Sequence, residues 1–381
     1  MAGLKLTSHS HARANHGHPW VFANEVQKLL APEYDGQAVG CRDGKGFLLG
    51  TGIYNGRSQI VWRRFSREKE ELDENFLRKT ITRSVNRRKP ETSRRLVWSE
   101  ADDLPGLIVD QYGDIVVMQA LTLAMDRLTP ILVSILKELL RPRFFILRND
   151  APIRLLEGLP LEVNTLGEER PTGRWCQIGE IDFWLDVVQG HKTGCYLDQR
   201  EQYLHVARYA KGRRVLDAFC NQGGFALHCA QAGAKEVVGV DLSEPAITLA
   251  RENARNSGGG ACFETENVFD WFRHRREEWD MIILDPPSFT KTKAKLDDAL
   301  RGYRELNLRA IQRLTPGGIL ATYTCSYHIS HDIFLEMLVS AAGDAKRDIR
   351  ILEICRQPLD HPIRLNMPES EYLRGFILEV E

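Results

Sequence analysis

The chain has 381 residues, which is long enough for more than one hydrophobic core, so we expect two or three domains. Hydrophobic residues make up 43% and charged residues 27%, a balance that excludes a disordered or fibrous chain. Because the formal net charge is only -1, any contact with nucleic acid must depend on local basic patches rather than on the charge of the whole molecule.

The sequence also argues against several classes of protein. The longest apolar run, residues 131–140, is interrupted by Lys137 and Glu138, so it does not predict a membrane-spanning helix. The eight cysteines show no Cys-x-x-Cys spacing, which argues against a zinc site and against a secreted disulfide framework. We therefore expect a cytoplasmic protein with no metal site and no membrane contact.

The first half of the chain predicts two small folded parts. Residues 39–65 alternate apolar and polar residues with turn residues at the breaks, which predicts an antiparallel β unit within residues 1–71. Residues 72–186 predict a central α+β domain. Its expected helices cover residues 73–89, before Pro90, and 125–140; its expected strands cover 96–98, 106–110, 115–120, 144–148, 162–166 and 182–188.

From residue 187 to 381, short apolar runs alternate with helical stretches. We expect strands at 214–219, 236–241, 263–267, 281–284 and 319–323, and helices that include 225–231 and 244–256. Alternating β and α elements predict a doubly wound, mostly parallel sheet, that is, a Rossmann-like α/β domain. The glycine run at residues 258–260 predicts a turn between a helix and a strand.

Polar residues end the first three expected strands of this α/β domain. Asp217 precedes a tight turn at Gly223 and Gly224, Asp241 ends the second strand, and Asn267 ends the third. Ligands of open α/β sheets bind at the carboxyl ends of the strands, where an acid such as Asp241 accepts hydrogen bonds from ribose hydroxyls. The amide of Asn267 could meet an adenine edge. The dinucleotide pattern Gly-x-Gly-x-x-Gly is absent, so a bound pyrophosphate is not implied. Together, in this order and at this spacing, the strand-end residues favour S-adenosylmethionine as the cofactor.

Two further strand ends carry residues suited to methyl transfer. Asp285 precedes two prolines that stiffen the loop, and Cys325 follows a later strand. A lone cysteine is usually a small buried hydrophobe, but facing a rigid carboxylate across a cofactor cleft it becomes a candidate nucleophile. Carbon-5 of cytosine reacts with a methyl donor only after a thiolate has added to carbon-6. The pair Asp285 and Cys325 therefore favours cytosine-5 methylation.

Motifs along nearly the whole chain resemble the large-subunit ribosomal RNA cytosine-5 methyltransferases. They are "HPWVFANEV" (18–26), "DDLPGLIVDQYGD" (102–114), "GHKTGCYLDQR" (190–200), "GGFA", "VVGVDLS", "DPPSF", "RGYRELNLRAIQ" (301–312), "TCS" and "DHPIRLNMPESEYLRGF" (360–376). The resemblance implies an RNA-binding PUA domain over 1–71, the central domain over 72–186, and a class I methyltransferase domain over 187–381. It also implies 23S ribosomal RNA as the substrate.

The same resemblance assigns roles to single residues. Cys325 is the attacking thiolate, and Asp285 orients the cytosine. The implied cofactor residues are Gln199, Arg200, Asp217, Phe219, Gly223, Asp241, Asn267 and Asp285. The chain departs from the family at Asn221–Gln222, where many members have Tyr-Thr, and at Asn267, where many have Asp. No cysteine stands beside the prolines, Ser288 being nearest, so no residue is assigned as the base for the final elimination.

Other readings of these residues stay open. An N-methyltransferase acting on an exocyclic amine would also use Asp285, and a non-catalytic RNA-binding protein would use neither Asp285 nor Cys325. Basic residues that could contact RNA phosphates are Arg13, Arg63, Arg64, Lys291, Lys293 and Lys295, with merely structural or solvated roles as the alternative. His328 or His331 could act as a base, but surface roles are the simpler expectation. A homodimer is left open.

Overall fold

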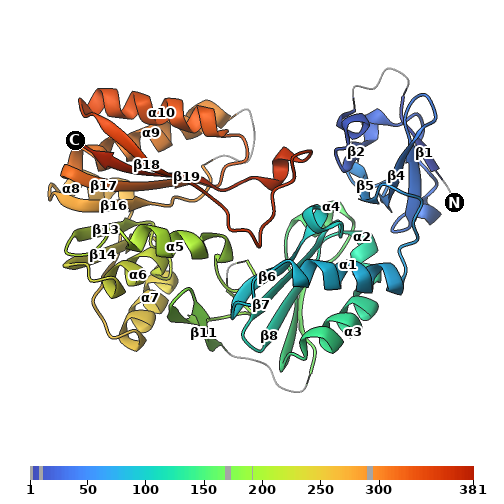
Figure 1. The fold of residues 1–381 in the computed structure, drawn as a ribbon, viewed down its shortest axis with the longest axis horizontal. Coiled ribbons are helices and arrows are strands. Elements are labelled where there is room, and N and C mark those ends of the chain that lie inside the picture. Colours follow the sequence, from blue (N-terminus) through green and yellow to red (C-terminus); the bar gives the residue numbers. More distant parts are fainter. Residues whose placement is uncertain (1–2, 8–11, 168–172, 191, 290–294) are drawn as a thin grey trace. The chain divides into compact units, whose positions relative to one another are not determined.

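The computed structural model describes residues 3–7, 12–167, 173–190, 192–289 and 295–381 (Figure 1). The chain divides into two compact units. Unit 1 comprises residues 1–176, 185–197 and 359–370, and unit 2 comprises residues 177–184, 198–358 and 371–381. None of the helices in the described part of the chain has the length and apolar character that crossing a bilayer requires.

The N-terminal part of unit 1 is a five-stranded sheet in the order β1-β3-β4-β5-β2. Its strands are β1 (Gly3–Lys5), β2 (Trp20–Phe22), β3 (Ala38–Arg42), β4 (Leu48–Tyr54) and β5 (Ile60–Ser66). The antiparallel pairing of β3, β4 and β5 confirms the β unit expected from the alternation of residues 39–65. Trp62 is fully buried in its core, where the indole N–H donates to the Val39 carbonyl oxygen at 3.0 Å.

The second sheet of unit 1 has the strand order β10-β9-β8-β7-β6. Its strands are β6 (Ser93–Trp98), β7 (Leu107–Tyr112), β8 (Ile115–Ala120), β9 (Phe144–Asn149) and β10 (Glu162–Thr165). Its helices are α1 (Glu74–Asn86), α2 (Leu123–Arg127), α3 (Thr129–Leu140) and α4 (Ile153–Leu156). The single helix expected over residues 125–140 is wrong: α2 ends at Arg127 and α3 begins at Thr129, because Pro130 lacks the N–H needed to continue the first helix.

A two-stranded ribbon, β11 (Arg174–Ile178) and β12 (Ile181–Leu185), precedes the α/β fold. Unit 2 is then built on a seven-stranded sheet in the order β15-β14-β13-β16-β17-β19-β18. Its strands are β13 (Arg214–Ala218), β14 (Glu236–Asp241), β15 (Cys262–Thr265), β16 (Trp279–Leu284), β17 (Leu314–Thr324), β18 (Ile349–Arg356) and β19 (Arg374–Val380). Strands β13 to β17 run parallel, and β19 is antiparallel to both of its neighbours.

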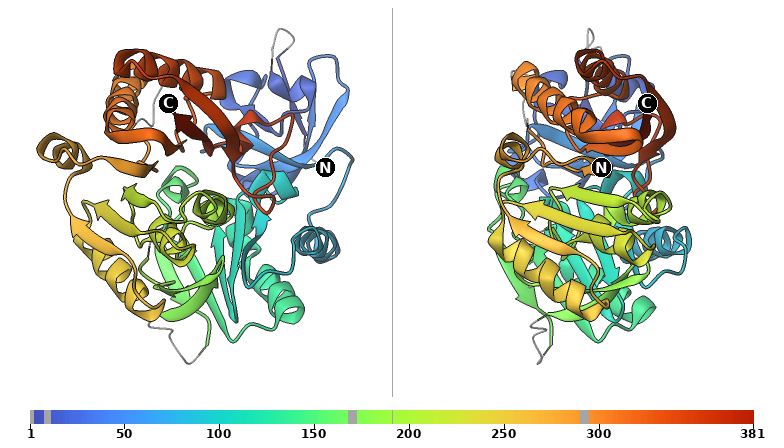
Figure 2. Two further views of the ribbon diagram at one scale, coloured as in Figure 1. Left: turned by 60° about the vertical axis from the view of Figure 1, so that its left-hand side comes forward. Right: turned by 90° about the vertical axis from the view of Figure 1, so that its left-hand side faces the viewer.

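Helices cover both faces of this sheet, as Figures 1 and 2 show. They are α5 (Arg200–Ala207), α6 (Gly224–Gln231), α7 (Glu244–Asn256), α8 (Val268–His274), α9 (Leu296–Arg313) and α10 (His331–Ala345). Side chains of α8, α9 and α10, such as Trp271, Leu306 and Phe334, share one buried core with the sheet residues Leu216 and Ile282. The α/β expectation is confirmed, and the antiparallel β18–β19 edge is an addition that we did not foresee.

Residues 359–370, which we call the strap, lie between β18 and β19 in the sequence but belong to unit 1. Within unit 1, Arg364 pairs with Asp103 at 2.7 Å. The Glu369 carboxylate pairs with His18 at 2.9 Å and with Arg13 at 2.5 Å. The strap therefore ties the N-terminal sheet and the central sheet together through ion pairs.

Candidate functional site

The expected site residues of unit 2 gather at the carboxyl edge of its sheet. Ala218 of β13 is aligned with Val240 of β14 and with Leu284 of β16, and Leu284 is aligned with Thr322 of β17. Asp241 and Asp285 each follow one of these aligned positions directly, and Cys325 follows Thr322 by three residues. The chain reverses its direction across the sheet between β13 and β16, which is where open α/β sheets bind ligands.

Asp217, one residue before the end of β13, is completely buried. Its Oδ2 accepts a hydrogen bond from the Ala226 backbone N–H at 2.9 Å, while its Oδ1 has no hydrogen-bond partner among the described residues. The pKa of Asp217 is raised to about 8, chiefly by burial and also by the nearby carboxylates of Asp285 and Asp241, while the hydrogen bond from Ala226 acts in the opposite direction. A buried acid with an unused acceptor suits a ligand that brings a donor or a positive charge.

The loop between β13 and α6 holds an unusual backbone conformation. Phe219 and Asn221 have φ of +73° and +48°, a region that costs a residue with a side chain on the order of 1–3 kcal/mol. Gly223 has φ of +87°, and a Cβ there would lie 2.9 Å from the ring of Phe263. Such a loop places backbone groups close to the strand ends, as a ligand-binding turn must.

Asp241 holds this loop in place. Its Oδ2 accepts a hydrogen bond from the Asn221 backbone N–H, and its Oδ1 accepts one from the Ser243 N–H, both at 2.9 Å. Each carboxylate oxygen has a second lone pair, so these bonds leave acceptor capacity for a ligand hydroxyl. The side chain is half-buried, as a residue between the fold and a ligand should be.

Asn267 plays a part that the sequence did not suggest. It caps the N-terminus of α8, where its Oδ1 accepts hydrogen bonds from the N–H groups of Phe269 at 2.9 Å and Asp270 at 3.4 Å. The oxygen expected to accept from an adenine amino group is thus already engaged. The side-chain NH₂ of Asn267 is the group left for a ligand.

Gln199 and Arg200 lie at the start of α5 and are almost completely buried, with 3% and 5% of their surface exposed. The Oε1 of Gln199 has no hydrogen-bond partner among the described residues. The neighbouring Asp198 accepts a hydrogen bond from the Tyr372 hydroxyl at 2.8 Å, which anchors this turn to the chain just before β19. Like the Oδ1 of Asp217, the Gln199 oxygen is a buried acceptor that a ligand could satisfy.

The loops that carry Asp285 and Cys325 are linked by hydroxyl groups. The Oγ atoms of Ser288 and Ser326 lie 2.8 Å apart, and the hydroxyl of Tyr303 lies 3.1 Å from the Oγ of Ser326. Asp285 and Cys325 themselves are half-buried. The sequence did not single out Tyr303 or Ser326 as site residues, although both stand in motifs, "RGYRELNLRAIQ" and "TCS", that we had noted.

Aromatic and histidine side chains near these loops take structural positions. Phe289, which follows the two prolines and Ser288, packs against Tyr303 with ring centroids 4.6 Å apart. His331 lies 3.6 Å from Asp332 and 5.0 Å from the ring of Phe376, and His328 packs beside Tyr327. These contacts fit the surface roles expected for the two histidines.

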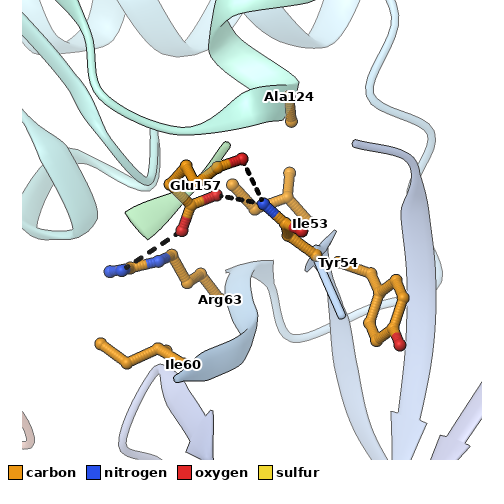
Figure 3. A pocket seen from close by; sticks show the side chains of 7 residues that line it. Ile53, Tyr54, Ile60, Arg63, Ala124 and Glu157 are labelled. Carbon is orange, nitrogen blue, oxygen red and sulfur yellow. Dashed lines mark hydrogen bonds and ion pairs between the residues drawn. The ribbon is translucent and has the colours of Figure 1, made fainter. Parts of the chain in front are cut away.

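The basic residues expected to contact RNA phosphates lie in different environments. Arg63 is engaged inside unit 1, where it pairs with Glu100 at 2.8 Å and lies 3.9 Å from Glu157 (Figure 3). Arg64 is buried and donates to the Gly17 carbonyl oxygen at 2.5 Å, and its pKa falls to about 10 because of that burial. Both arginines are therefore structural. Lys291 and Lys293 lie outside the described residues, and Lys295 is exposed just before α9.

Figure 3 shows the small pocket around Glu157 in unit 1. The Nδ2 of Asn55 donates to the Oε2 of Glu157 at 2.8 Å and to its carbonyl oxygen at 3.1 Å. The other residues that line the pocket are Ile53, Tyr54, Ile60, Arg63 and Ala124. Within the pocket the Glu157 carboxylate is thus hydrogen bonded by Asn55 and paired with Arg63.

Comparison with known proteins identifies two family models in the chain. The model described as S-adenosylmethionine-dependent methyltransferase matches residues 139–362, and the model described as PUA-like domain matches residues 4–67. The first of these covers more than half of the chain, and the second covers the five-stranded N-terminal sheet.

Relatives resemble the chain over nearly its full length. Proteins named ribosomal RNA large subunit methyltransferase I are 37% identical in Aeromonas hydrophila and 38% identical in Tolumonas auensis, each over 95% of both chains. A crystal structure determined in complex with SAH has a TM-score of 0.85 at 21% identity, and a structure from Streptococcus mutans has a TM-score of 0.84 at 21% identity. Each alignment covers 100% of this chain and 100% of the chain in the solved structure, so the fold is shared along the whole length.

Proposed function

Because this chain belongs to the family of S-adenosylmethionine-dependent methyltransferases whose members include the proteins named ribosomal RNA large subunit methyltransferase I, we propose that it methylates carbon-5 of a cytosine in 23S ribosomal RNA through a covalent adduct with Cys325. The observation that carries this proposal is the hydroxyl link between Ser288 and Ser326, which holds the loop of Asp285 beside the loop of Cys325.

The cofactor of this family is S-adenosylmethionine, and the strand-end residues fit it. The unpaired Oδ1 of Asp217 suits the cationic methionine end of the cofactor, and Asp241 suits the ribose hydroxyls. The turn at Gly223 gives the backbone close approach, and Phe219, Gln199 and Asn267 are the further contacts that we propose, with Arg200 against the cofactor carboxylate. When bound, the cofactor supplies an electrophilic methyl group.

The chain's own residues would prepare the cytosine. The Cys325 thiolate adds to carbon-6, the ring nitrogen N3 takes up a proton, and carbon-5 becomes nucleophilic. Asp285, held rigid by the following prolines, accepts hydrogen bonds from the N3–H and amino groups and fixes the ring. After methylation, a base removes the carbon-5 proton, N3 returns its proton, and the Cys325 sulfur leaves. The bond between carbon-6 and sulfur and the N3–H bond are thereby broken again, and the bond between carbon-5 and the methyl group remains in place of the carbon-5 proton.

An N-methyltransferase acting on an exocyclic amine would need an aromatic side chain near the prolines to stack on the base. Phe289 instead packs into the fold against Tyr303 and Phe269. This inward position of Phe289 supports cytosine-5 methylation, in which the Cys325 thiolate, and not a stacked aromatic ring, holds the base. A non-catalytic RNA-binding protein would have no use for the destabilising burial of Asp217.

Ribosomal RNA is the substrate that the names of the relatives suggest. In this proposal the PUA-like domain contributes RNA contacts, and the target cytosine leaves its stack to reach the strand-end pocket. With ribosomal RNA as its substrate, the protein would act in the cytoplasm. The homodimer and the domain limits at residues 71 and 186 remain predictions.

The experiment that tests the proposal uses 23S ribosomal RNA containing 5-fluorocytosine. Methyl transfer should proceed, but elimination should stall because fluorine does not leave as a proton does, so the protein should stay covalently joined to the RNA. Cys325→Ala should form no adduct and no 5-methylcytosine while binding S-adenosylmethionine normally. Cys262→Ala, which changes an exposed cysteine, is the matched control. Near-normal turnover by Cys325→Ala would favour the exocyclic N-methyltransferase instead.

A further inference from the structure

We propose that Tyr303 is a positioning residue whose hydroxyl fixes the Cys325 loop against the Asp285 loop before substrate binds. The proposal rests on the proposed function, because it assumes that these two loops carry the reaction. Tyr303 stands in the middle of α9, the 18-residue helix that follows the Asp285 loop, and its side chain is completely buried.

The Tyr303 hydroxyl contacts the residue that follows Cys325 in the sequence. It lies 3.1 Å from the Oγ of Ser326. Thr324, the last residue of β17, stands on the other side of Cys325 and joins the same group of hydroxyls through Ser326. Ser326 is held further by its backbone N–H, which donates to the Thr324 hydroxyl at 3.2 Å.

Tyr303 reaches the Asp285 loop by two routes. Its ring packs against the ring of Phe289, and its hydroxyl is linked through the Oγ of Ser326 to the Oγ of Ser288, which lies 2.8 Å from Ser326. The ring of Tyr303 is itself fixed between Phe289 at 4.6 Å and Phe334 at 6.1 Å. The two loops therefore share a rigid brace that consists of the hydroxyls of Ser288, Tyr303, Thr324 and Ser326.

The protonation state of the Tyr303 hydroxyl suits a structural role rather than the role of a general base. Burial raises the pKa of Tyr303 to about 12, although the hydrogen bond with Ser326 lowers it in part. The phenol thus stays protonated at neutral pH and is enclosed, so it holds neighbours in place and takes no proton from a substrate. A base for the elimination must lie elsewhere.

The brace should matter for rate rather than for binding. A misplacement of about 1 Å at a reacting group can cost on the order of a hundredfold in rate. Tyr303→Phe keeps the ring and removes the hydroxyl, so we expect single-turnover methyl transfer to slow by roughly tenfold to a hundredfold. The affinities for S-adenosylmethionine and for 23S ribosomal RNA should stay within about twofold of the unaltered protein, since the brace touches neither ligand in this account.

Tyr209→Phe is the matched control within unit 2. Its hydroxyl donates to Glu353 at 2.7 Å, and it lies before β13 begins, away from the carboxyl edge of the sheet. Both variants lose one hydrogen bond to a tyrosine hydroxyl, so both should lower the melting temperature, but only Tyr303→Phe should slow methyl transfer. An equal rate in the two variants would overturn the proposal.

A double-mutant cycle tests whether Tyr303 and Ser288, which Ser326 links, act together. If Ser288→Ala and Tyr303→Phe each slow methyl transfer through the same link, the double variant should be no slower than about the worse single variant. Ser288→Thr, which keeps the hydroxyl, should restore most of the rate lost in Ser288→Ala. Independent, additive losses, or no rescue by threonine, would mean that the hydroxyls are not one brace.

The readout separates this proposal from the chemistry that it assumes. The first assay measures the total methyl label transferred to ribosomal RNA, and it reports how well the loops are positioned, whichever atom of the base accepts the methyl group. The second assay measures the covalent adduct with fluorocytosine RNA, and it reports the covalent step. If Cys325→Ala stays active while Tyr303→Phe is slow with normal affinities, the covalent mechanism fails and the brace stands. If Cys325→Ala is inactive and Tyr303→Phe is fully active, the brace fails and the covalent mechanism stands.

Discussion

The carboxylate of Asp241 accepts a hydrogen bond at 2.9 Å from the backbone N–H of Asn221, which stands 20 residues earlier in the chain. One side chain at the end of β14 thereby fixes the turn that follows β13. The turn includes Phe219 and Asn221, both at positive φ, so its shape depends on such an anchor. Asp241 therefore shapes the turn, and in our proposal it also faces the ribose of the cofactor.

Asp241→Ala should weaken the binding of S-adenosylmethionine by roughly 1–3 kcal/mol, because charge-assisted hydrogen bonds are lost. Asp241→Asn keeps one oxygen to accept from Asn221 or from the ribose, so its loss should be smaller. Isothermal titration calorimetry measures both. Unchanged affinity in Asp241→Ala would remove this residue from the proposed cofactor site.

The buried acid Asp217 predicts how cofactor binding depends on pH. Its pKa is about 8 in the folded protein, so the carboxyl group is largely protonated at pH 7 and ionised above pH 8. If the cationic end of S-adenosylmethionine lies beside it, the ligand favours the ionised form. Affinity should therefore rise as pH increases from 6 toward 8 and level off above, with proton release on binding near neutrality.

Calorimetry in two buffers of different ionisation enthalpy counts the protons released. Asp217→Asn cannot ionise, so it should release fewer protons and lose most of the pH dependence below pH 8. The variant should also bind the cofactor more weakly at pH 8 than the unaltered protein does. The same proton count in both proteins would show that Asp217 does not face the cation.

Asp285 is predicted to fix the cytosine ring, beside the cofactor contact that the family resemblance implies for it. Asp285→Ala should lose most of the methyl transfer, because nothing then holds the nitrogen edge of the ring as the sulfur adds. The amide oxygen of Asp285→Asn can still accept a hydrogen bond, so the activity of this variant should lie between that of Asp285→Ala and that of the unaltered protein. The affinity for S-adenosylmethionine, measured separately, should change less than the rate does. A rate close to normal in Asp285→Ala would contradict this role.

Glu369 of the strap predicts a response to acid. Burial alone would raise its pKa, but hydrogen bonds from His18 and Arg13 lower it from 4.5 to about 2. Because the pKa of Glu369 is lower in the folded than in the unfolded protein, its carboxylate stabilises the folded state, and this contribution is fully present above pH 4.5. The contribution is lost as pH falls from 4.5 toward 2. At pH 7 the contribution is of the order of 3 kcal/mol, at 1.36 kcal/mol per pKa unit.

Glu369→Gln should be less stable than the unaltered protein at pH 7, and the difference should shrink as pH falls below 4.5. Urea unfolding at several pH values measures it. Glu336→Gln, which changes an exposed glutamate on α10, controls for the general loss of one charge. A stability difference that stays constant down to pH 2 would mean that Glu369 does not hold the strap by its charge.

The local features of this protein were readable in its sequence. Alternation predicted the antiparallel strands β3 to β5, and the βα rhythm predicted the parallel sheet of unit 2, because both depend on side chains a few residues apart. Asp241 and the residues from Glu244 to Asn256 fall at the expected strand end and in the expected helix. The cofactor class followed, since each strand end carried its own polar residue in order.

Tertiary structure alone decided which side chains meet. The Oγ atoms of Ser288 and Ser326 are brought together across 38 residues of chain, and Arg13 meets Glu369 across 356. Asn267 looked like an adenine contact, yet its oxygen caps α8. Periodicity and motif order fix backbone elements locally, but a hydroxyl or carboxylate finds its partner only when whole elements pack, and that packing depends on the shape and burial of many residues at once.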